Sequence, residues 1–213
     1  MKIQRVISIV AGGEQAKIFL SHIANSDMVI GVDGGTLWLL KNGIVPHAAV
    51  GDFDSVSKKQ LATIKKIVKK VTVYPAKKEA TDLELAVRQA IALAPAKVVI
   101  YGALGKRFDH AYGAVQLLTT LTSHNILGEI VDNFNKLIVS GGTLRLAPDR
   151  RYRYVSVVPL GASATVSLDG FVYDGTGLAL SSGSTLGISN EIMADVGVIT
   201  VHKGQALVIQ SRD

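Results

Sequence analysis

Two aspartates two positions apart, in the segment Gly51-Asp52-Phe53-Asp54-Ser55, are the first residues of this chain that could carry chemistry. On an extended chain, Asp52 and Asp54 would point to one side and Phe53 to the other, toward a core, because side chains alternate with period two. Two carboxylates on one side can hold a hard divalent cation. Gly51 would let the backbone approach a ligand, and Ser55 is placed to cap the next helix. The alternative is an ordinary loop with two solvated aspartates, since short motifs match by chance.

Further aspartates follow other predicted strands. Asp33 follows the second strand, Asp109 lies in the loop after the fifth, and Asp82 begins the helix after the fourth. In open parallel sheets, ligands bind beyond the carboxyl ends of the strands. A single aspartate there is ordinary because Asp caps helices, but these three together with the earlier pair predict a carboxylate cluster for Mg²⁺.

Glycine-rich turns at the same predicted edge could bind phosphate. They are Gly12-Gly13, Gly34-Gly35 and Gly102-Ala103-Leu104-Gly105-Lys106-Arg107. Backbone N–H groups at such turns and at helix N-termini favour anions, and Arg107 adds a fork of donors. The chain has neither a Gly-x-x-x-x-Gly-Lys-[Ser/Thr] motif nor a Gly-x-Gly-x-x-Gly after its first strand. The chain thus combines a predicted metal site with phosphate-binding turns but lacks both common nucleotide-binding motifs. This combination narrows the possible enzyme classes to unusual phosphoryl-type transferases or phosphohydrolases.

The elements that must position these side chains alternate along residues 1–133. Apolar runs predict strands at residues 3–10, 28–32, 48–50, 71–74, 98–101 and 126–131. Helical spacing predicts helices at residues 14–25, 58–70 (the lysine-rich stretch), 81–93 and 109–121. It also predicts a short helix that contains Leu37 and Leu40 and stops at Asn42-Gly43. Near-continuous apolar strands separated by helices predict an α/β domain with a doubly wound, mostly parallel sheet.

Residues 134–213 differ from the first part of the chain in composition and pattern. Segments rich in Val, Thr and Tyr are interrupted by turn residues, and no helical period remains. Residues 196–201 and 206–210 flank His202-Lys203-Gly204-Gln205, which predicts a hairpin. We therefore predict a second, small all-β domain of sandwich or jelly-roll-like type. About 80 residues are few for a sandwich alone, which favours packing against a partner.

Composition limits the function further. The 213 residues carry a formal charge of +6 with no cysteine, which excludes disulfides and thiolate metal sites. Six of the lysines fall on one arc of the predicted helix over 58–70, opposite an apolar arc, as on a solvated outer face. No base-reading motif accompanies them, so nucleic acid is not expected as a partner. No apolar run approaches the roughly 20 residues of a membrane span, so no membrane association and a cytoplasmic location are expected.

Five motifs in register resemble one known family over nearly the whole chain. In order they are Asp33-Gly34-Gly35, Gly51-Asp52-Phe53-Asp54-Ser55, Thr81-Asp82-Leu83-Glu84-Leu85-Ala86, Gly102-Ala103-Leu104-Gly105-Lys106-Arg107-Phe108-Asp109-His110 and Gly187-Ile188-Ser189-Asn190-Glu191. The set resembles the thiamine pyrophosphokinases. The resemblance implies an α/β domain over residues 1–133 that binds ATP and Mg²⁺, and an all-β domain over residues 134–213 for thiamine binding and dimerisation. It also implies a homodimer whose active sites are shared between subunits.

The resemblance assigns roles residue by residue. The catalytic and metal-binding positions are Asp52, Asp54 and Asp82. The nucleotide-binding positions are Asp33, Gly34, Gly35, Gly105, Lys106, Arg107, Asp109 and His110, and the thiamine-binding positions are Ser189 and Asn190. Lys106 stands where the family usually has Gly, so the loop would be strained if φ there had to be positive. His110 has two possible roles: it could contact phosphate, or it could cap and orient the glycine-rich loop.

The implied reaction is transfer of a diphosphate group from ATP to the primary hydroxyl of thiamine, giving thiamine diphosphate and AMP. Two alternatives stay open. One is a related Mg²⁺-dependent transferase with a different acceptor, because the resemblance defines the chemistry better than the acceptor. The other is a non-catalytic phosphate or nucleic-acid binder that uses the lysine face and is indifferent to the aspartates.

Overall fold

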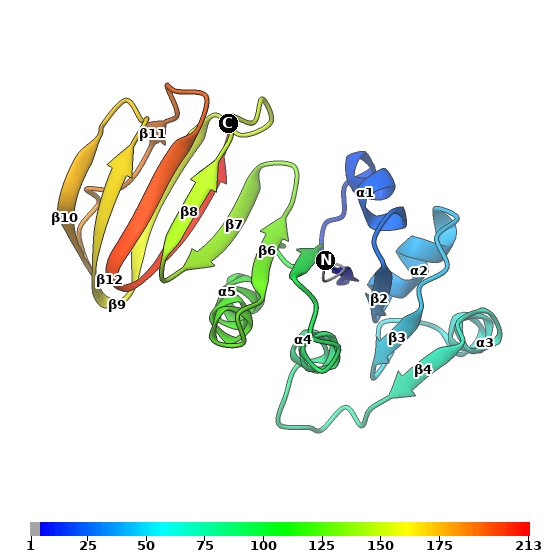
Figure 1. Ribbon diagram of the computed structural model, residues 1–213. Helices are drawn as coiled ribbons and strands as arrows, with labels where there is room; N and C mark the ends of the chain where they lie inside the picture. Colours follow the sequence, from blue (N-terminus) through cyan, green and yellow to red (C-terminus); the bar gives the residue numbers. More distant parts are fainter. Residues whose placement is uncertain (1–4) are drawn as a thin grey trace. The chain divides into compact units, whose positions relative to one another are not determined.

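The computed structural model describes residues 5–213 and divides into two compact units, with the boundary between Asp132 and Asn133 (Figure 1). Within those residues, none of the helices combines the length and the apolar character that crossing a membrane requires.

The first unit contains a sheet in which every pairing between its described strands is parallel. Its strands are β1 (Val6–Val10), β2 (Met28–Val32), β3 (Ala48–Gly51), β4 (Lys70–Val73), β5 (Lys97–Tyr101) and β6 (Leu127–Val131), in the spatial order β6-β5-β1-β2-β3-β4. Four consecutive residues are buried in each of β1, β2 and β5, which is the pattern of strands covered on both faces. The chain runs outward from β1 to β4 and then returns to the other side of β1, so β1 and β5 flank the switch point. The predicted doubly wound parallel sheet is confirmed.

Helices cover this sheet. They are η1 (Lys17–Phe19), α1 (Leu20–Ala24), α2 (Gly34–Lys41), α3 (Lys58–Ile67), α4 (Asp82–Ile91) and α5 (Phe108–Ser123). Helix α4 packs against β1, β2 and β3 and also against α5, whereas α2 packs against β1, β2 and α3 (Figure 1). The strand order reverses direction after β4, so the right-handed crossover rule puts α4 and α5 on one face and the earlier helices on the other, in agreement with the contacts of α4 with α5 and of α2 with α3.

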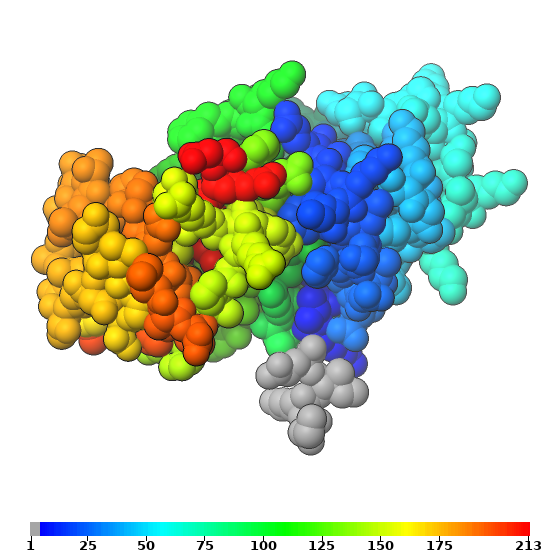
Figure 2. Space-filling view, turned by 90° about the horizontal axis from the view of Figure 1, so that it is seen from above, coloured from blue at the N-terminus to red at the C-terminus, as the bar shows by residue number. Residues whose placement is uncertain are grey.

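Helix α3 shows how the local sequence sets an element and its start. Ile64 and Val68 are buried while the lysines of the helix are exposed, although Ile67, predicted for the apolar arc, is 42 % exposed. Figure 2 shows long side chains extending outward from this cyan part of the chain. The predicted cap at Ser55 is wrong. Ser57 caps the helix in a capping box with Gln60, whose backbone N–H donates to Ser57 Oγ at 3.3 Å.

The start of the chain departs from the prediction in two ways. The first strand begins at Val6, and positions 3 and 4 of the predicted strand lie outside the described residues. The predicted helix over 14–25 begins only at Lys17, as a 3₁₀ turn. The loop before it is held instead by Gly13 N–H, which donates to Gly102 O at 2.9 Å, and by the Gln15 amide, which donates to Ala11 O at 2.6 Å.

The second unit is antiparallel and centres on two long strands. Its strands are β7 (Asn135–Ser140), β8 (Thr143–Leu146), β9 (Tyr154–Asp169), β10 (Gly175–Ser181), β11 (Asn190–Glu191) and β12 (Gly197–Ser211). Strand β12 pairs with β7, β8 and β9, and both halves of β9 and β12 contribute to one apolar core. The all-β prediction is confirmed, but the predicted hairpin at 202–205 is wrong. Residues 197–211 form one strand that keeps pairing with β9 through register shifts around Lys203, a bulge that Gly204 accommodates at φ +79°.

Candidate active site

Three carboxylates meet where neighbouring strands of the first unit end. Asp33 follows β2, Asp52 follows β3, and Asp82 is the first residue of α4, after β4. One oxygen from each lies within 4.8 Å of the others, and all three side chains are partly buried. We call these three residues the carboxylate cluster. It forms because β2, β3 and β4 are consecutive neighbours in the sheet, so their carboxyl ends share one edge.

Asp33 is held tightly in this cluster. Its backbone has φ 45°, and its Oδ1 accepts a hydrogen bond from the backbone N–H of Phe53 at 3.0 Å. A Cβ atom added at Gly51 would lie 1.8 Å from Asp33 Oδ1, so only glycine leaves room for the carboxylate. Burial raises the pKa of Asp33 to about 6 despite that hydrogen bond, and Asp82, Asp52 and Asp54 add to the rise.

Asp54 lies outside the carboxylate cluster. Strand β3 ends at Gly51, and Phe53 has φ 57°, so the extended geometry that would align Asp54 with Asp52 is absent. Asp54 is exposed and instead donates its backbone N–H to Asp52 Oδ1 at 3.1 Å. The assumption of period two is therefore wrong here, although Phe53 is buried in the core as predicted, at 3 % exposure. The hydrogen bond from Asp54 N–H is the largest cause that lowers the pKa of Asp52, and it outweighs the effect of burial.

A lysine that the sequence interpretation missed reaches into the carboxylate cluster. Lys78 Nζ lies 3.1 Å from Asp52 Oδ2 and 3.0 Å from Asp82 Oδ1. Burial lowers the pKa of Lys78, but its contacts with Asp82 and Asp52 outweigh burial and leave it raised. The signal that could have revealed it is its position four residues before Asp82 in a loop that leads into a helix.

The carboxylate cluster fits a divalent cation by its donor set. All three residues offer carboxylate oxygens, the ligands that hard cations prefer. Asp82 Oδ1 is buried, and its partner among residues 5–213 is the Lys78 ammonium, 3.0 Å away. A buried carboxylate oxygen that already faces one cationic group is suited to bind a metal cation.

Close backbone approaches shape the edge beside the cluster. A Cβ atom at Gly13 would lie 2.4 Å from Gly102 O, and one at Gly35 would lie 2.1 Å from Val10 O. The loops after β1 and β5 therefore touch at the switch point, and the start of α2 abuts the end of β1. Ligands of open α/β sheets bind at this place.

The predicted nucleotide segment from Gly105 to His110 is exposed throughout. Two guanidinium nitrogens of Arg107 donate to Asp109, Nε to Oδ1 at 3.2 Å and Nη2 to Oδ2, and this pairing lowers the pKa of Asp109. The two nitrogens in this pairing, Nε and Nη2, reach a phosphate only if they release Asp109. Lys106 is not among the non-glycine residues with positive φ within 5–213, so its substitution for Gly adds no strain there. Asp109 is not part of the carboxylate cluster.

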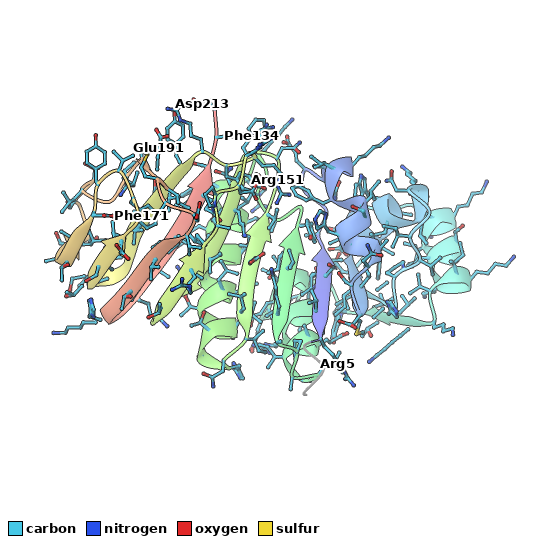
Figure 3. The ribbon with its side chains drawn as sticks, turned by 45° about the horizontal axis from the view of Figure 1, so that its top comes forward. Arg5, Phe134, Arg151, Phe171, Glu191 and Asp213 are labelled. Atoms are coloured by element: carbon cyan, nitrogen blue, oxygen red, sulfur yellow. The ribbon has the colours of Figure 1, made fainter. Side chains whose placement is uncertain are left out.

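In the second unit, Asn190 acts as a clamp. Its Oδ1 accepts from the backbone N–H of Tyr173 at 3.0 Å, and its Nδ2 donates to Tyr173 O at 2.8 Å. Asn190 is 6 % exposed, whereas Tyr173 is 70 % exposed. Ser189 beside it has φ 60° and donates its N–H to Ser156 Oγ at 3.0 Å. Figure 3 labels Phe171 and Glu191, which lie on the two segments that the clamp joins. Asn190 thus positions the Tyr173 segment, and both polar atoms of its side-chain amide are engaged in hydrogen bonds to the backbone of this segment.

A cavity of about 470 Å³ also occurs in the second unit. It is lined by Lys136, Arg145, Leu146, Ala147, Pro148, Asp149, Arg150 and Gln210. None of the predicted site residues lines it.

Comparison with known proteins covers both units. Residues 19–128 match the family model described as thiamin pyrophosphokinase, catalytic domain, and residues 143–208 match that described as thiamin pyrophosphokinase, vitamin B1 binding domain. The chain is 35 % identical over 213 residues to the thiamine pyrophosphokinase of Bacillus subtilis (strain 168), covering 98 % of this chain and 100 % of that protein. The crystal structure of thiamine pyrophosphokinase from Bacillus subtilis is similar with a TM-score of 0.90 at 33 % identity, covering 98 % of this chain and 100 % of that chain. The crystal structure of thiamin pyrophosphokinase from Geobacillus thermodenitrificans has a TM-score of 0.87 at 35 % identity, covering 98 % of each chain.

Proposed function

The chain belongs to the thiamine pyrophosphokinase family, and from this premise we propose how its residues carry out the transfer. The reaction moves the β- and γ-phosphates of ATP to the primary hydroxyl of thiamine and releases AMP. The observation that carries the assignment of residues is the carboxylate cluster, which lies at the sheet edge where such folds bind ligands.

Mg²⁺ is the metal proposed for the carboxylate cluster. Asp52 and Asp82 would hold it, with Asp33 as the third carboxylate within reach and Asp54 as the further ligand that the family resemblance implies. When bound, the ion would neutralise negative charge on the polyphosphate. The three partly buried carboxylates that share this edge of the sheet support this proposal.

The nucleotide is proposed to bind along the glycine turns beside the cluster. Backbone N–H groups at Gly34, Gly35 and Gly105 favour phosphate oxygens. Arg107 would exchange its pairing with Asp109 for a phosphate, which the planar guanidinium can also bind through two donors. Support for this step is the exposure of the whole segment.

Transfer of the diphosphate group depends on how the two substrates are positioned and on electrostatic stabilisation more than on a covalent intermediate with the protein. The thiamine hydroxyl oxygen attacks the β-phosphorus in line, a new O–P bond forms, and the bond from that phosphorus to the oxygen bridging to the α-phosphate breaks. AMP leaves with that oxygen. The hydroxyl proton would pass to one of the carboxylates at this edge of the sheet.

The thiamine side of the site is proposed to come from the second unit of a partner chain. Ser189 and Asn190 match the family motif, and Asn190 positions the exposed Tyr173. A homodimer with shared sites, and a cytoplasmic location where ATP is available, are parts of the same proposal. The exposed lysines of α3 lie on an outer face, and we assign no nucleic-acid partner to them.

The decisive experiment is an assay of the purified full chain with ATP, Mg²⁺ and thiamine, resolved by chromatography. AMP and thiamine diphosphate should appear in equal amounts. ADP with thiamine monophosphate would refute attack at the β-phosphorus. Other primary alcohols tested in parallel should be poor acceptors, and Asp52→Asn should be inactive while it keeps the wild-type circular dichroism spectrum.

A further inference from the structure

The carboxylate cluster contains its own cation. Three carboxylates within 4.8 Å repel one another, and the partial burial of the cluster limits how far water screens that repulsion. The Lys78 ammonium lies between two of them, and its side chain is only 14 % exposed. The lysines of α3, by contrast, are exposed. Lys78 is therefore placed to offset the repulsion between the carboxylates, unlike the solvent-exposed lysines of α3.

The loop holds Lys78 in this position. Nζ also donates to Pro75 O at 3.3 Å, so the ammonium has an acceptor in its own loop as well as Asp52. Lys78 lies four residues before Asp82, and the N-terminus of α4 begins at that aspartate. A short tether of this kind keeps the ammonium close to the cluster even after an individual contact breaks.

We propose that Lys78 is a built-in counter-cation of the carboxylate cluster: in the metal-free protein it offsets part of the negative charge of the cluster, and a divalent metal must share its place or take it over. The proposal rests on the proposed metal site. Its physical basis is that Lys78 contacts Asp52 Oδ2 and Asp82 Oδ1, oxygens of two carboxylates that are proposed to hold the metal. Displacing the ammonium opposes binding of the free ion. A polyphosphate gives the displaced ammonium a new partner, so metal should bind better together with nucleotide than alone.

The test compares Lys78→Met with Lys77→Met, the exposed neighbour in the same loop. Free Mn²⁺ is titrated by electron paramagnetic resonance, with and without a non-hydrolysable ATP analogue. Lys78→Met should bind Mn²⁺ alone about tenfold more tightly than wild type and should lose most of the gain that the analogue gives wild type. Its melting temperature in EDTA should fall by several degrees and recover with Mn²⁺. Lys77→Met should match wild type in every measurement.

Two outcomes would overturn the proposal. One is unchanged Mn²⁺ affinity in Lys78→Met, with a melting temperature lowered equally in EDTA and in Mn²⁺, which would make Lys78 a loop tether only. The other is weaker Mn²⁺ binding. Should Lys78→Met not fold, Lys78→Gln, which keeps a donor for Pro75 O but no charge, is judged by the same criteria. Asp52→Asn distinguishes failure of the Lys78 proposal from failure of the proposed metal site. If Asp52→Asn binds Mn²⁺ like wild type, the metal site itself is wrongly assigned.

Discussion

Removing the charge of Asp33 should stabilise the metal-free protein, and the gain should depend on pH. Asp33→Asn keeps the shape of the side chain, and the amide oxygen can still accept from Phe53 N–H. The wild-type carboxyl has its pKa raised from 3.8 to about 6, first by burial. The folded state therefore binds the proton more tightly than the unfolded state, and stability is lost as pH rises through about 6.

The magnitude follows from that difference. About two pKa units correspond to at most about 3 kcal/mol, at about 1.4 kcal/mol for each unit. Asp33 is only partly buried, so screening by water reduces the expected gain to roughly 1–2 kcal/mol at pH 8. Near pH 4 the gain should vanish, because the carboxyl is then protonated in the folded state and carries no buried charge.

The assay is urea unfolding in EDTA at intervals from pH 5 to 8, with the exposed Asp195→Asn as the matched control. The difference between Asp33→Asn and wild type should grow with pH and level off above 7, whereas Asp195→Asn should follow wild type. Saturating Mg²⁺ should reverse the order, because the variant lacks one carboxylate of the cluster. Parallel pH curves for Asp33→Asn and wild type would refute the argument that burial of this carboxyl costs stability.

Further predictions test the packing, the metal ligands and the assembly. Gly51→Ala places a Cβ 1.8 Å from Asp33 Oδ1, so we expect a loss of about 1–3 kcal/mol in unfolding free energy; stability equal to wild type would contradict the packing. Asp54→Asn should lower turnover by roughly 10²–10³-fold yet leave the melting temperature in EDTA unchanged, because the side chain is exposed; wild-type turnover at limiting Mg²⁺ would exclude it as a ligand. Co-expressed Asp52→Ala and Asn190→Ala chains should form heterodimers with one intact site and about half the wild-type activity. Heterodimers no better than the better parent would place the whole site within one chain.

Local sequence was a good guide wherever an element depends on burial alone. The inner strands of the first unit are apolar runs because both faces of a parallel sheet are covered there, and each predicted run lies within about two residues of a strand in the described chain. Burial of Phe53 followed from the same pattern. Prediction failed where a backbone conformation decided the outcome. Nothing local shows that Phe53 has φ 57°, or that Lys203 lies in a bulge instead of a turn.

The sequence by itself determined the kind of chemistry, through aspartates after strands, glycine turns and five motifs in register. Only the tertiary structure decided which aspartates meet. Asp33 and Asp82 join Asp52 because β2 and β4 flank β3, whereas Asp109 follows β5, on the other side of β1. Asp54, two residues from Asp52, is turned away by one positive φ, and Lys78 enters through a loop whose path depends on the elements around it. Strand order and single dihedral angles arise from long-range packing, which residue types and their spacing do not encode.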